Sequence, residues 1–123
     1  MEENTKGKIL ICDDTDAIRM TLSNILKKEN FEIFEAENGE QAICNYSDIK
    51  PDVVIMDLTM PKVDGIKALE KIKEIDSHAK IIMCSGIHDP YTINNAFYKG
   101  ALDFIFKPFS KERVFEAVTK VLN

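Results

Sequence analysis

The run Val53-Val54-Ile55-Met56-Asp57 is the most apolar stretch of the chain, and it ends in a carboxylate. Consecutive apolar residues of this kind are typical of a strand that is buried on both faces of a parallel sheet. Pro51 before the run and Pro61 after it mark its boundaries, because proline interrupts regular backbone hydrogen bonding. The stretch therefore predicts a central strand with an acidic side chain at its carboxyl end.

Similar short runs predict four more strands, at residues 9–12, 31–36, 81–84 and 104–106. The run at 31–36 is the most polar and is expected nearer an edge of the sheet. Between the runs, apolar residues recur at helical spacing. Asn38 and Ser110 are predicted N-caps of the second and last helices. Five strands that alternate with five helices imply a parallel sheet with helices on both faces and right-handed crossovers.

Composition indicates one soluble domain. The chain has 123 residues, of which 45% are hydrophobic and 30% charged, with a formal net charge of -5. No apolar run approaches the roughly 20 residues of a membrane span, and the polar start of the chain does not resemble a signal peptide. Acidic residues outnumber basic ones, 21 to 16, which disfavours nucleic-acid binding. We therefore expect a cytoplasmic protein with no membrane insertion and no direct contact with nucleic acid.

Two sets of side chains are interpreted as core residues and not as a site. The cysteines match no zinc-binding spacing and are expected to be reduced thiols that pack as small hydrophobic groups. Four phenylalanines are expected in the core or close to it. The two sets are Cys12, Cys44 and Cys84, and Phe97, Phe106, Phe109 and Phe115.

Polar side chains follow four of the predicted strands. In open parallel sheets the ligand site lies beyond the carboxyl ends of the strands. These ends are followed by Asp13 and Asp14, by Asp57, by Ser85 and by Lys107, in chain order. Because parallel strands end at the same edge of a sheet, we expect three carboxylates, a hydroxyl and an ammonium group to converge there.

The carboxylates suggest a site for a divalent cation. Crowded like charges raise one another's pKa unless a cation neutralises them. Mg²⁺ prefers a few carboxylates together with water and a phosphate oxygen, so Asp13, Asp14 and Asp57 form a candidate open Mg²⁺ site, with Mn²⁺ as a substitute. The competing interpretation is that these acids only cap helices, as Asp14 or Asp16 could for the first helix.

The same edge suits the acceptance of a phosphoryl group. A carboxylate can attack phosphorus to form an aspartyl phosphate, a reaction that depends mainly on positioning and on charge neutralisation. Asp57 is the candidate nucleophile because it follows the most buried run. Mg²⁺ and Lys107 would each neutralise one phosphoryl oxygen, and the Ser85 hydroxyl would donate to a third.

Residues 11–14, 56–65, 84–86 and 104–109 resemble, in order and spacing, the receiver domain of two-component response regulators. The resemblance implies a flavodoxin-like (βα)5 doubly wound α/β fold whose five-stranded parallel sheet has the order 2-1-3-4-5. The receiver domain would span residues 8–123, after a disordered or loosely ordered tail of residues 1–7. Among receivers the chain is most similar to the single-domain chemotaxis type, because nothing follows the last predicted helix.

The resemblance also implies a role for each residue of the site. Asp57 would accept a phosphoryl group from the histidine of a sensor kinase or from a phosphotransfer protein. Asp13, Asp14, Asp57 and the backbone carbonyl of Thr59 would hold Mg²⁺. Lys107 would pair with the phosphoryl group.

Ser85 and Phe104 stand at the two switch positions of the family. A phosphoryl group adds about -1.5 to -2 charges and three acceptor oxygens. We expect Ser85 to move toward it and Phe104 to turn inward into the vacated space. The face formed by residues 90–100, by the strand at 104–106 and by the last helix would then bind an unknown downstream protein.

Other functions stay open at this point. A module on the same fold can act by binding alone, although such proteins usually lack one of the acids or the lysine. A small phosphatase with an aspartate nucleophile would need a second acid where Thr59 stands. A carrier of FMN would need a hydroxyl- and glycine-rich loop where residues 13–16 are mostly acidic. The expectation is a signalling switch that is monomeric or weakly dimeric, and not an enzyme.

Overall fold

The computed structural model describes residues 5–123, in which five strands alternate with five helices. The strands are β1 (Lys8–Cys12), β2 (Glu32–Ala36), β3 (Val53–Met56), β4 (Ile81–Ser85) and β5 (Asp103–Phe106). The helices are α1 (Asp16–Lys28), α2 (Gly39–Ile49), α3 (Gly65–Ile75), α4 (Pro90–Tyr98) and α5 (Lys111–Leu122). The predicted elements are therefore all present, close to their expected positions.

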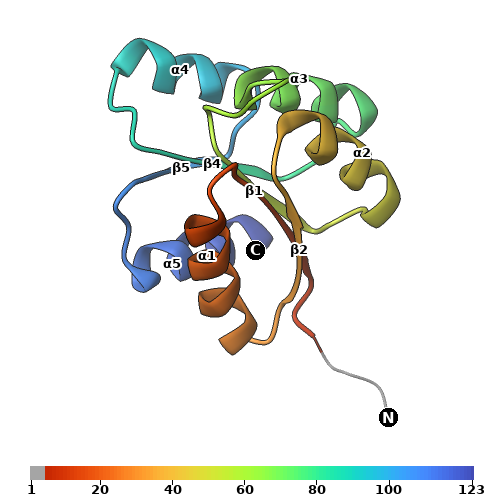
Figure 1. The fold of residues 1–123 in the computed structure, drawn as a ribbon, viewed down its shortest axis with the longest axis vertical. Helices are drawn as coiled ribbons and strands as arrows, with labels where there is room; N and C mark the ends of the chain where they lie inside the picture. Colours follow the sequence, from red (N-terminus) through yellow and green to blue (C-terminus); the bar gives the residue numbers. More distant parts are fainter. Residues whose placement is uncertain (1–4) are drawn as a thin grey trace.

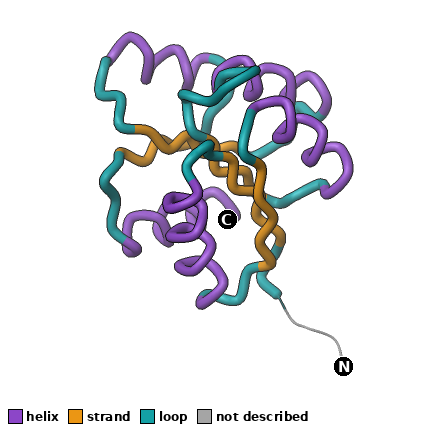
Figure 2. Tube along the Cα trace, in the orientation of Figure 1, coloured by secondary structure: helices purple, strands orange, loops and turns teal. Residues whose placement is uncertain are grey.

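All strands join one parallel sheet in the order β2-β1-β3-β4-β5. Helices α2, α3 and α4 cover one face, and α1 and α5 cover the other (Figure 1). Figure 2 shows the twisted sheet between these two helical layers. Strand β2 lies at an edge and is the least buried, as its polar sequence predicted. The flavodoxin-like fold class and its strand order are thus confirmed.

The central strands divide their side chains between two cores. Successive residues of a strand point to opposite faces. Leu10, Val54 and Met83 belong to the core under α2, α3 and α4, whereas Ile11 and Ile55 belong to the core under α1 and α5. Because both faces are covered, β3 and β4 are buried along their whole length. This is why these strands read as continuous apolar runs.

Short-range hydrogen bonds set the starts of the helices. The side chains of Asn38 and Ser110 each accept a hydrogen bond from the backbone N–H three residues later, at 2.9 and 3.1 Å. Both predicted N-caps are therefore confirmed. Thr15 is the N-cap of α1, with no side-chain cap hydrogen bond. Neither Asp14 nor Asp16 caps α1, so the capping interpretation of the first acids is wrong.

Two of the three cysteines behave as predicted. Cys12 and Cys84 are buried, and Cys44 lies exposed on α2. Burial raises the pKa of Cys84 to about 12 and also raises that of Cys12, so both remain thiols at neutral pH. The core interpretation was wrong for Cys44, because the apolar stripe of α2 passes through Ala42 and Tyr46 instead.

Two of the four phenylalanines that were expected in the core or close to it are exposed instead. Phe97 is 43% exposed and Phe106 is 38% exposed. Helix α4 turns Ala96 toward the core, which places its neighbour Phe97 outside. Phe106 ends the edge strand β5 and stacks on the ring of His88, with 4.5 Å between the ring centroids.

The expected tail of residues 1–7 is described only from residue 5 onward. The Lys6 ammonium group lies 5.9 Å from the ring centroid of Phe31 and 5.4 Å from that of Phe115. The rest of the predicted tail, residues 1–4, lies outside the described residues. Within residues 5–123, no helix combines the length and the apolar character that crossing a bilayer requires.

Gly65, the first residue of α3, allows that helix to touch the backbone just beyond β3. A Cβ at Gly65 would lie 2.0 Å from the carbonyl oxygen of Asp57 and 2.8 Å from the Cα of Leu58. Gly65→Ala is therefore expected to lower the free energy of unfolding by about 3 kcal/mol, the upper end of the usual cost of overpacking. Urea unfolding followed by circular dichroism measures this loss.

Gly86→Ala is the matched control, because no atom lies within 4 Å of a Cβ at Gly86. Its stability is expected to stay within about 0.5 kcal/mol of the parent. Equal losses in the two variants would contradict the close approach at Gly65.

Candidate functional site

Backbone pairing continues one residue beyond the strands and brings the predicted site residues together. The N–H of Asp57 donates to the carbonyl of Cys12 at 2.9 Å, and the N–H of Lys107 donates to the carbonyl of Ser85 at 2.9 Å. The parallel register thus sets Asp13 beside Asp57, whereas Ser85 lies opposite Phe106 and is bonded to Lys107, the next residue. Asp13 and Asp57 follow the neighbouring strands β1 and β3. Ser85 ends β4, and Lys107 follows β5, which is the neighbour of β4 in the sheet.

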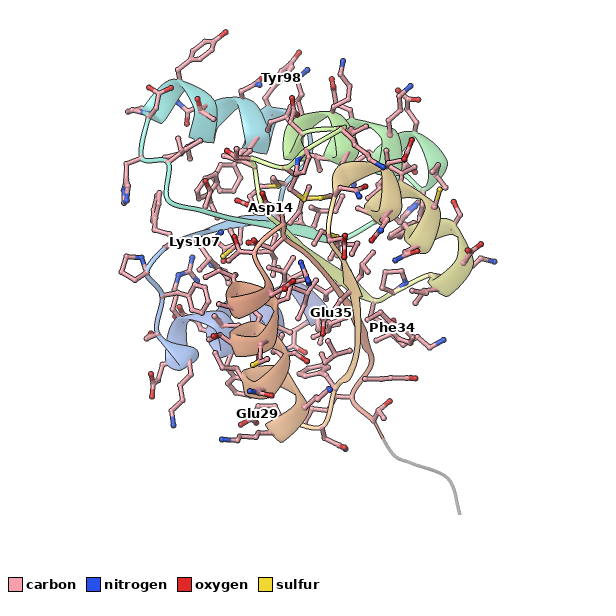
Figure 3. The ribbon with its side chains drawn as sticks, viewed as in Figure 1. Asp14, Glu29, Phe34, Glu35, Tyr98 and Lys107 are labelled. Carbon is pink, nitrogen blue, oxygen red and sulfur yellow. The ribbon has the colours of Figure 1, made fainter. Side chains whose placement is uncertain are left out.

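The predicted convergence of carboxylates is confirmed. One oxygen each from Asp13, Asp14 and Asp57 lies within 4.8 Å of the others. Asp13 and Asp57 are buried, and Asp14 is exposed. In Figure 3, Asp14 and Lys107 lie at the same edge of the sheet. The cluster is therefore open to solvent on the side of Asp14.

Lys107 supplies the cation of this cluster. Its Nζ lies 2.7 Å from Asp13 Oδ2 and 3.5 Å from Asp57 Oδ1. Burial alone would lower the pKa of Lys107, but the hydrogen bond to Asp13 and the charges of both carboxylates raise it overall. The peptide bond from Lys107 to Pro108 is cis. One protonated amine thus faces three carboxylates, and the cluster keeps a net negative charge.

The negative charge of the cluster affects the pKa of Asp57. Burial and the charge of Asp13 raise the pKa of Asp57, against the opposing effects of Lys107 and of a hydrogen bond from the backbone N–H of Thr59. A carboxylate in such surroundings gains from an added cation. The hard carboxylate oxygens, open on one side, fit the coordination chemistry of Mg²⁺.

The two predicted switch residues lie inside the protein. Ser85 is buried, and its Oγ accepts a hydrogen bond from the N–H of Ile87 at 3.1 Å. Phe104 is 4% exposed, and its ring is tilted against that of Phe106, with 5.1 Å between centroids. The ring that was expected to turn inward on phosphorylation is therefore already inward in this structure.

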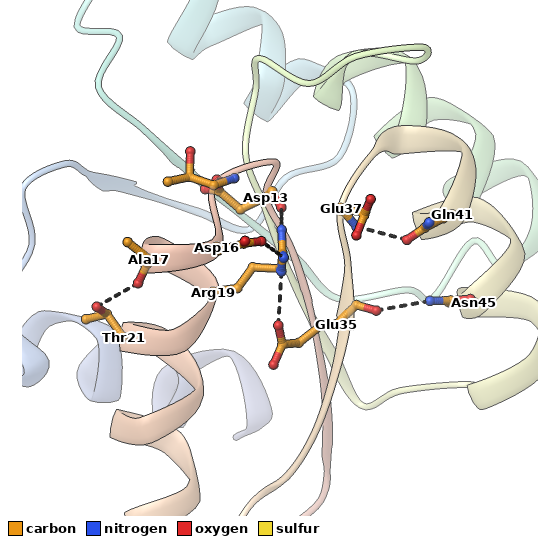
Figure 4. Close-up of polar contacts among 10 residues, drawn as sticks. Asp13, Asp16, Ala17, Arg19, Thr21, Glu35, Glu37, Gln41 and Asn45 are labelled. Carbon is orange, nitrogen blue, oxygen red and sulfur yellow. Dashed lines mark hydrogen bonds and ion pairs between the residues drawn. The ribbon is translucent and has the colours of Figure 1, made fainter.

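Sequence reasoning missed Arg19, a buried residue at the start of α1. Figure 4 shows that its guanidinium group bridges Asp13, Asp16 and Glu35. One signal was available, because Arg19 stands three positions before Leu22 and so falls on the buried stripe of the helix. A basic residue at a core position needs partners that neutralise and hydrogen-bond it.

Comparison with known proteins agrees with this geometry. Residues 9–119 match the family described as the response regulator receiver domain. The chain is 50% identical over 117 residues to the chemotaxis protein CheY of Bacillus subtilis (strain 168), across 94% of this chain and 98% of the relative. It is also 42% identical over 117 residues to the protein CcdB of the same organism, with the same two coverages.

The fold has close counterparts among solved structures. A chain of the CheX-CheY-BeF3-Mg complex from Borrelia burgdorferi aligns with a TM-score of 0.92 at 35% identity, across 94% of this chain and 89% of that one. The family match, the similarity to CheY and the strand order agree with one another. The chain belongs to the response regulator receiver domain family.

Proposed function

We propose that this receiver accepts a phosphoryl group on Asp57 in the presence of Mg²⁺ and then binds a downstream protein. CheY-like receivers are switches of two-component signalling and not classical enzymes, and receivers bind Mg²⁺ at an acidic pocket. The observation that carries the proposal is the cluster of Asp13, Asp14 and Asp57, with the ammonium of Lys107 in contact with two of them.

Asp57 is the proposed nucleophile. It extends from the buried strand β3, and its carboxylate lies within reach of the one ammonium group of the cluster. A carboxylate oxygen attacks the phosphorus of a phosphohistidine on a sensor kinase or a phosphotransfer protein. The P–N bond breaks, the histidine nitrogen keeps its electron pair, and an aspartyl phosphate forms. Later attack by water returns the carboxylate and releases inorganic phosphate.

The other residues of the site hold and neutralise charge. Asp13, Asp14, Asp57 and the backbone carbonyl of Thr59 are the proposed ligands of Mg²⁺, for which Mn²⁺ would substitute. When bound, the ion neutralises charge on the phosphoryl group. Lys107 adds a mobile point charge, and it would turn from Asp13 toward the phosphoryl oxygens.

Ser85 is the proposed link between the site and α4. Its hydroxyl donates to a phosphoryl oxygen, while its Oγ is already bonded to the N–H of Ile87 in the loop before α4. Because Phe104 is inward here, we propose that phosphorylation stabilises an arrangement that the protein already visits. The ligand then shifts a population and does not create a new conformation.

The face formed by α4, β5 and α5 is the proposed docking surface for the downstream protein. Tyr91 is 81% exposed and Tyr98 is 88% exposed; in Figure 3, Tyr98 points away from the sheet. Aromatic side chains of this kind are enriched in protein interfaces. The neighbour from Borrelia burgdorferi, a CheY solved together with CheX, BeF3 and Mg, supports the roles of the metal and of a protein partner. We also propose a cytoplasmic monomer or weak dimer, with residues 8–123 as the receiver domain.

Acetyl phosphate labelling tests Asp57 as the acceptor. With Mg²⁺ present, the parent is expected to gain one phosphoryl group, and Asp57→Asn is expected to gain none, because an amide oxygen is a poor nucleophile. Intact-protein mass spectrometry measures the gain, and a chelator should abolish it in the parent.

Asp64→Asn is the control for this experiment. Asp64 is an exposed N-cap of α3, and asparagine caps a helix about as well as aspartate. This variant should label like the parent. An unlabelled parent, or a labelled Asp57→Asn, would reject the assignment.

Amide NMR spectra test the switch. Phosphorylation is expected to shift the signals of Ile87, Tyr91 and Phe106, because the Ser85 bond connects the site to this face. Signals from the middle of α2 should stay in place, and Asp57→Asn should show no shifts at all. A labelled parent whose α4, β5 and α5 signals do not move would favour the binding module that works without phosphorylation.

A further inference from the structure

The guanidinium group of Arg19 joins three elements beside the carboxylate cluster. The residue is 8% exposed, a rare position for a charged residue. Nη1 donates to the backbone carbonyl of Asp13 at 2.6 Å, Nε donates to Glu35 at 3.0 Å, and Nη2 donates to Asp16. In Figure 4 the side chain reaches from α1 back to the end of β1 and across to β2. One rigid planar group thus fixes the loop between β1 and α1.

The hydrogen bond from Arg19 to the backbone carbonyl of Asp13 affects the positions of both Asp13 and Asp14. The carbonyl that Arg19 holds belongs to the peptide group between Asp13 and Asp14, so its orientation affects both residues. The Asp13 carboxylate is held separately, since Oδ1 accepts the N–H of Thr15 at 2.9 Å and Oδ2 accepts Lys107 Nζ at 2.7 Å. Those two bonds orient the carboxylate, and Arg19 fixes the backbone from which it extends.

Charge and geometry have opposite effects here. A positive charge near the cluster opposes the binding of a further cation. However, the guanidinium of Arg19 is paired with the carboxylates of Asp16 and Glu35, so little of its charge acts on the cluster. Its hydrogen bond to the peptide group is direct, and the geometric effect therefore dominates.

From these contacts we propose that Arg19 is a positioning residue that holds Asp13 and Asp14 in the arrangement that binds Mg²⁺. The proposal rests on the proposed Mg²⁺ site. Partners that orient metal ligands from outside contribute about 10- to 100-fold to metal affinity. Without Arg19, the peptide group between the two acids can rotate, and the binding of the ion must first order it.

Arg19→Lys separates the two effects, because lysine keeps the charge but lacks the planar fork that reaches all three partners. Mg²⁺ affinity, measured by calorimetry on folded protein, is expected to fall about tenfold. Labelling by acetyl phosphate at saturating Mg²⁺ is expected to return close to the parental rate, because the loss is one of affinity. Circular dichroism establishes that the variant is folded at the temperature of the measurement.

Arg113→Lys is the matched control. Arg113 also donates to a carboxylate, that of Asp103 at 2.9 Å, and to a backbone carbonyl, that of Phe104 at 3.2 Å. It does so from α5, and it contacts none of the three acids. Its substitution should cost similar stability and leave Mg²⁺ affinity at the parental value.

The outcomes separate this proposal from the proposed function. Parental or tighter Mg²⁺ binding by folded Arg19→Lys overturns the positioning role, whereas a parent that takes up no Mg²⁺ rejects the site itself. If Arg19→Lys does not fold, Glu35→Gln replaces it, because this change weakens the carboxylate anchor on β2 that orients the guanidinium of Arg19 toward the carbonyl of Asp13. A loss of Mg²⁺ affinity in Glu35→Gln that is smaller than the one expected for Arg19→Lys supports the proposal, and unchanged affinity in Glu35→Gln overturns it.

Discussion

Repulsion among carboxylates at one edge of a parallel sheet is the constraint on which the site depends. The strand order brings Asp13, Asp14 and Asp57 together, and burial with a like charge raises the pKa of Asp57. Such an arrangement costs free energy, and it persists because interactions elsewhere determine the fold. Two apolar cores hold the strands in register without help from the acids. The fold itself therefore holds the three acids together.

Two arginines hold the ends of the sheet in a similar manner. Arg19 on α1 binds the backbone carbonyl of Asp13 after β1, and Arg113 on α5 binds the carbonyl of Phe104 in β5. Each also pairs with a carboxylate, that of Glu35 or that of Asp103. The planar guanidinium suits such a pair of contacts, because its donors can reach a carbonyl and a carboxylate at the same time. In both cases a helix on one face of the sheet fixes strand backbone, Arg19 just beyond the carboxyl end of β1 and Arg113 near the start of β5.

Much of this architecture could be predicted from local sequence, because burial on both faces leaves a direct mark on composition. The run that ends at Asp57 identified both a central strand and the candidate acceptor, and the acids after β1 followed from topology. Contacts between side chains that are far apart in the sequence are harder to predict from local sequence patterns. Arg19 falls on the buried stripe of α1, but its partner Glu35 is brought beside it only by the pairing of β1 and β2. The inward ring of Phe104 and the outward ring of Phe97 depend on packing that no local pattern reveals.

The unequal exposure of the three thiols has a practical consequence for measuring conformational change. Cys12 and Cys84 are sealed in the interior, and their raised pKa values keep the reactive thiolate scarce. Cys44 faces solvent on α2, on a helix that supplies none of the acids of the cluster. A maleimide-linked dye or spin label would therefore attach to one position of the native chain, giving an optical or magnetic reporter without any engineered residue.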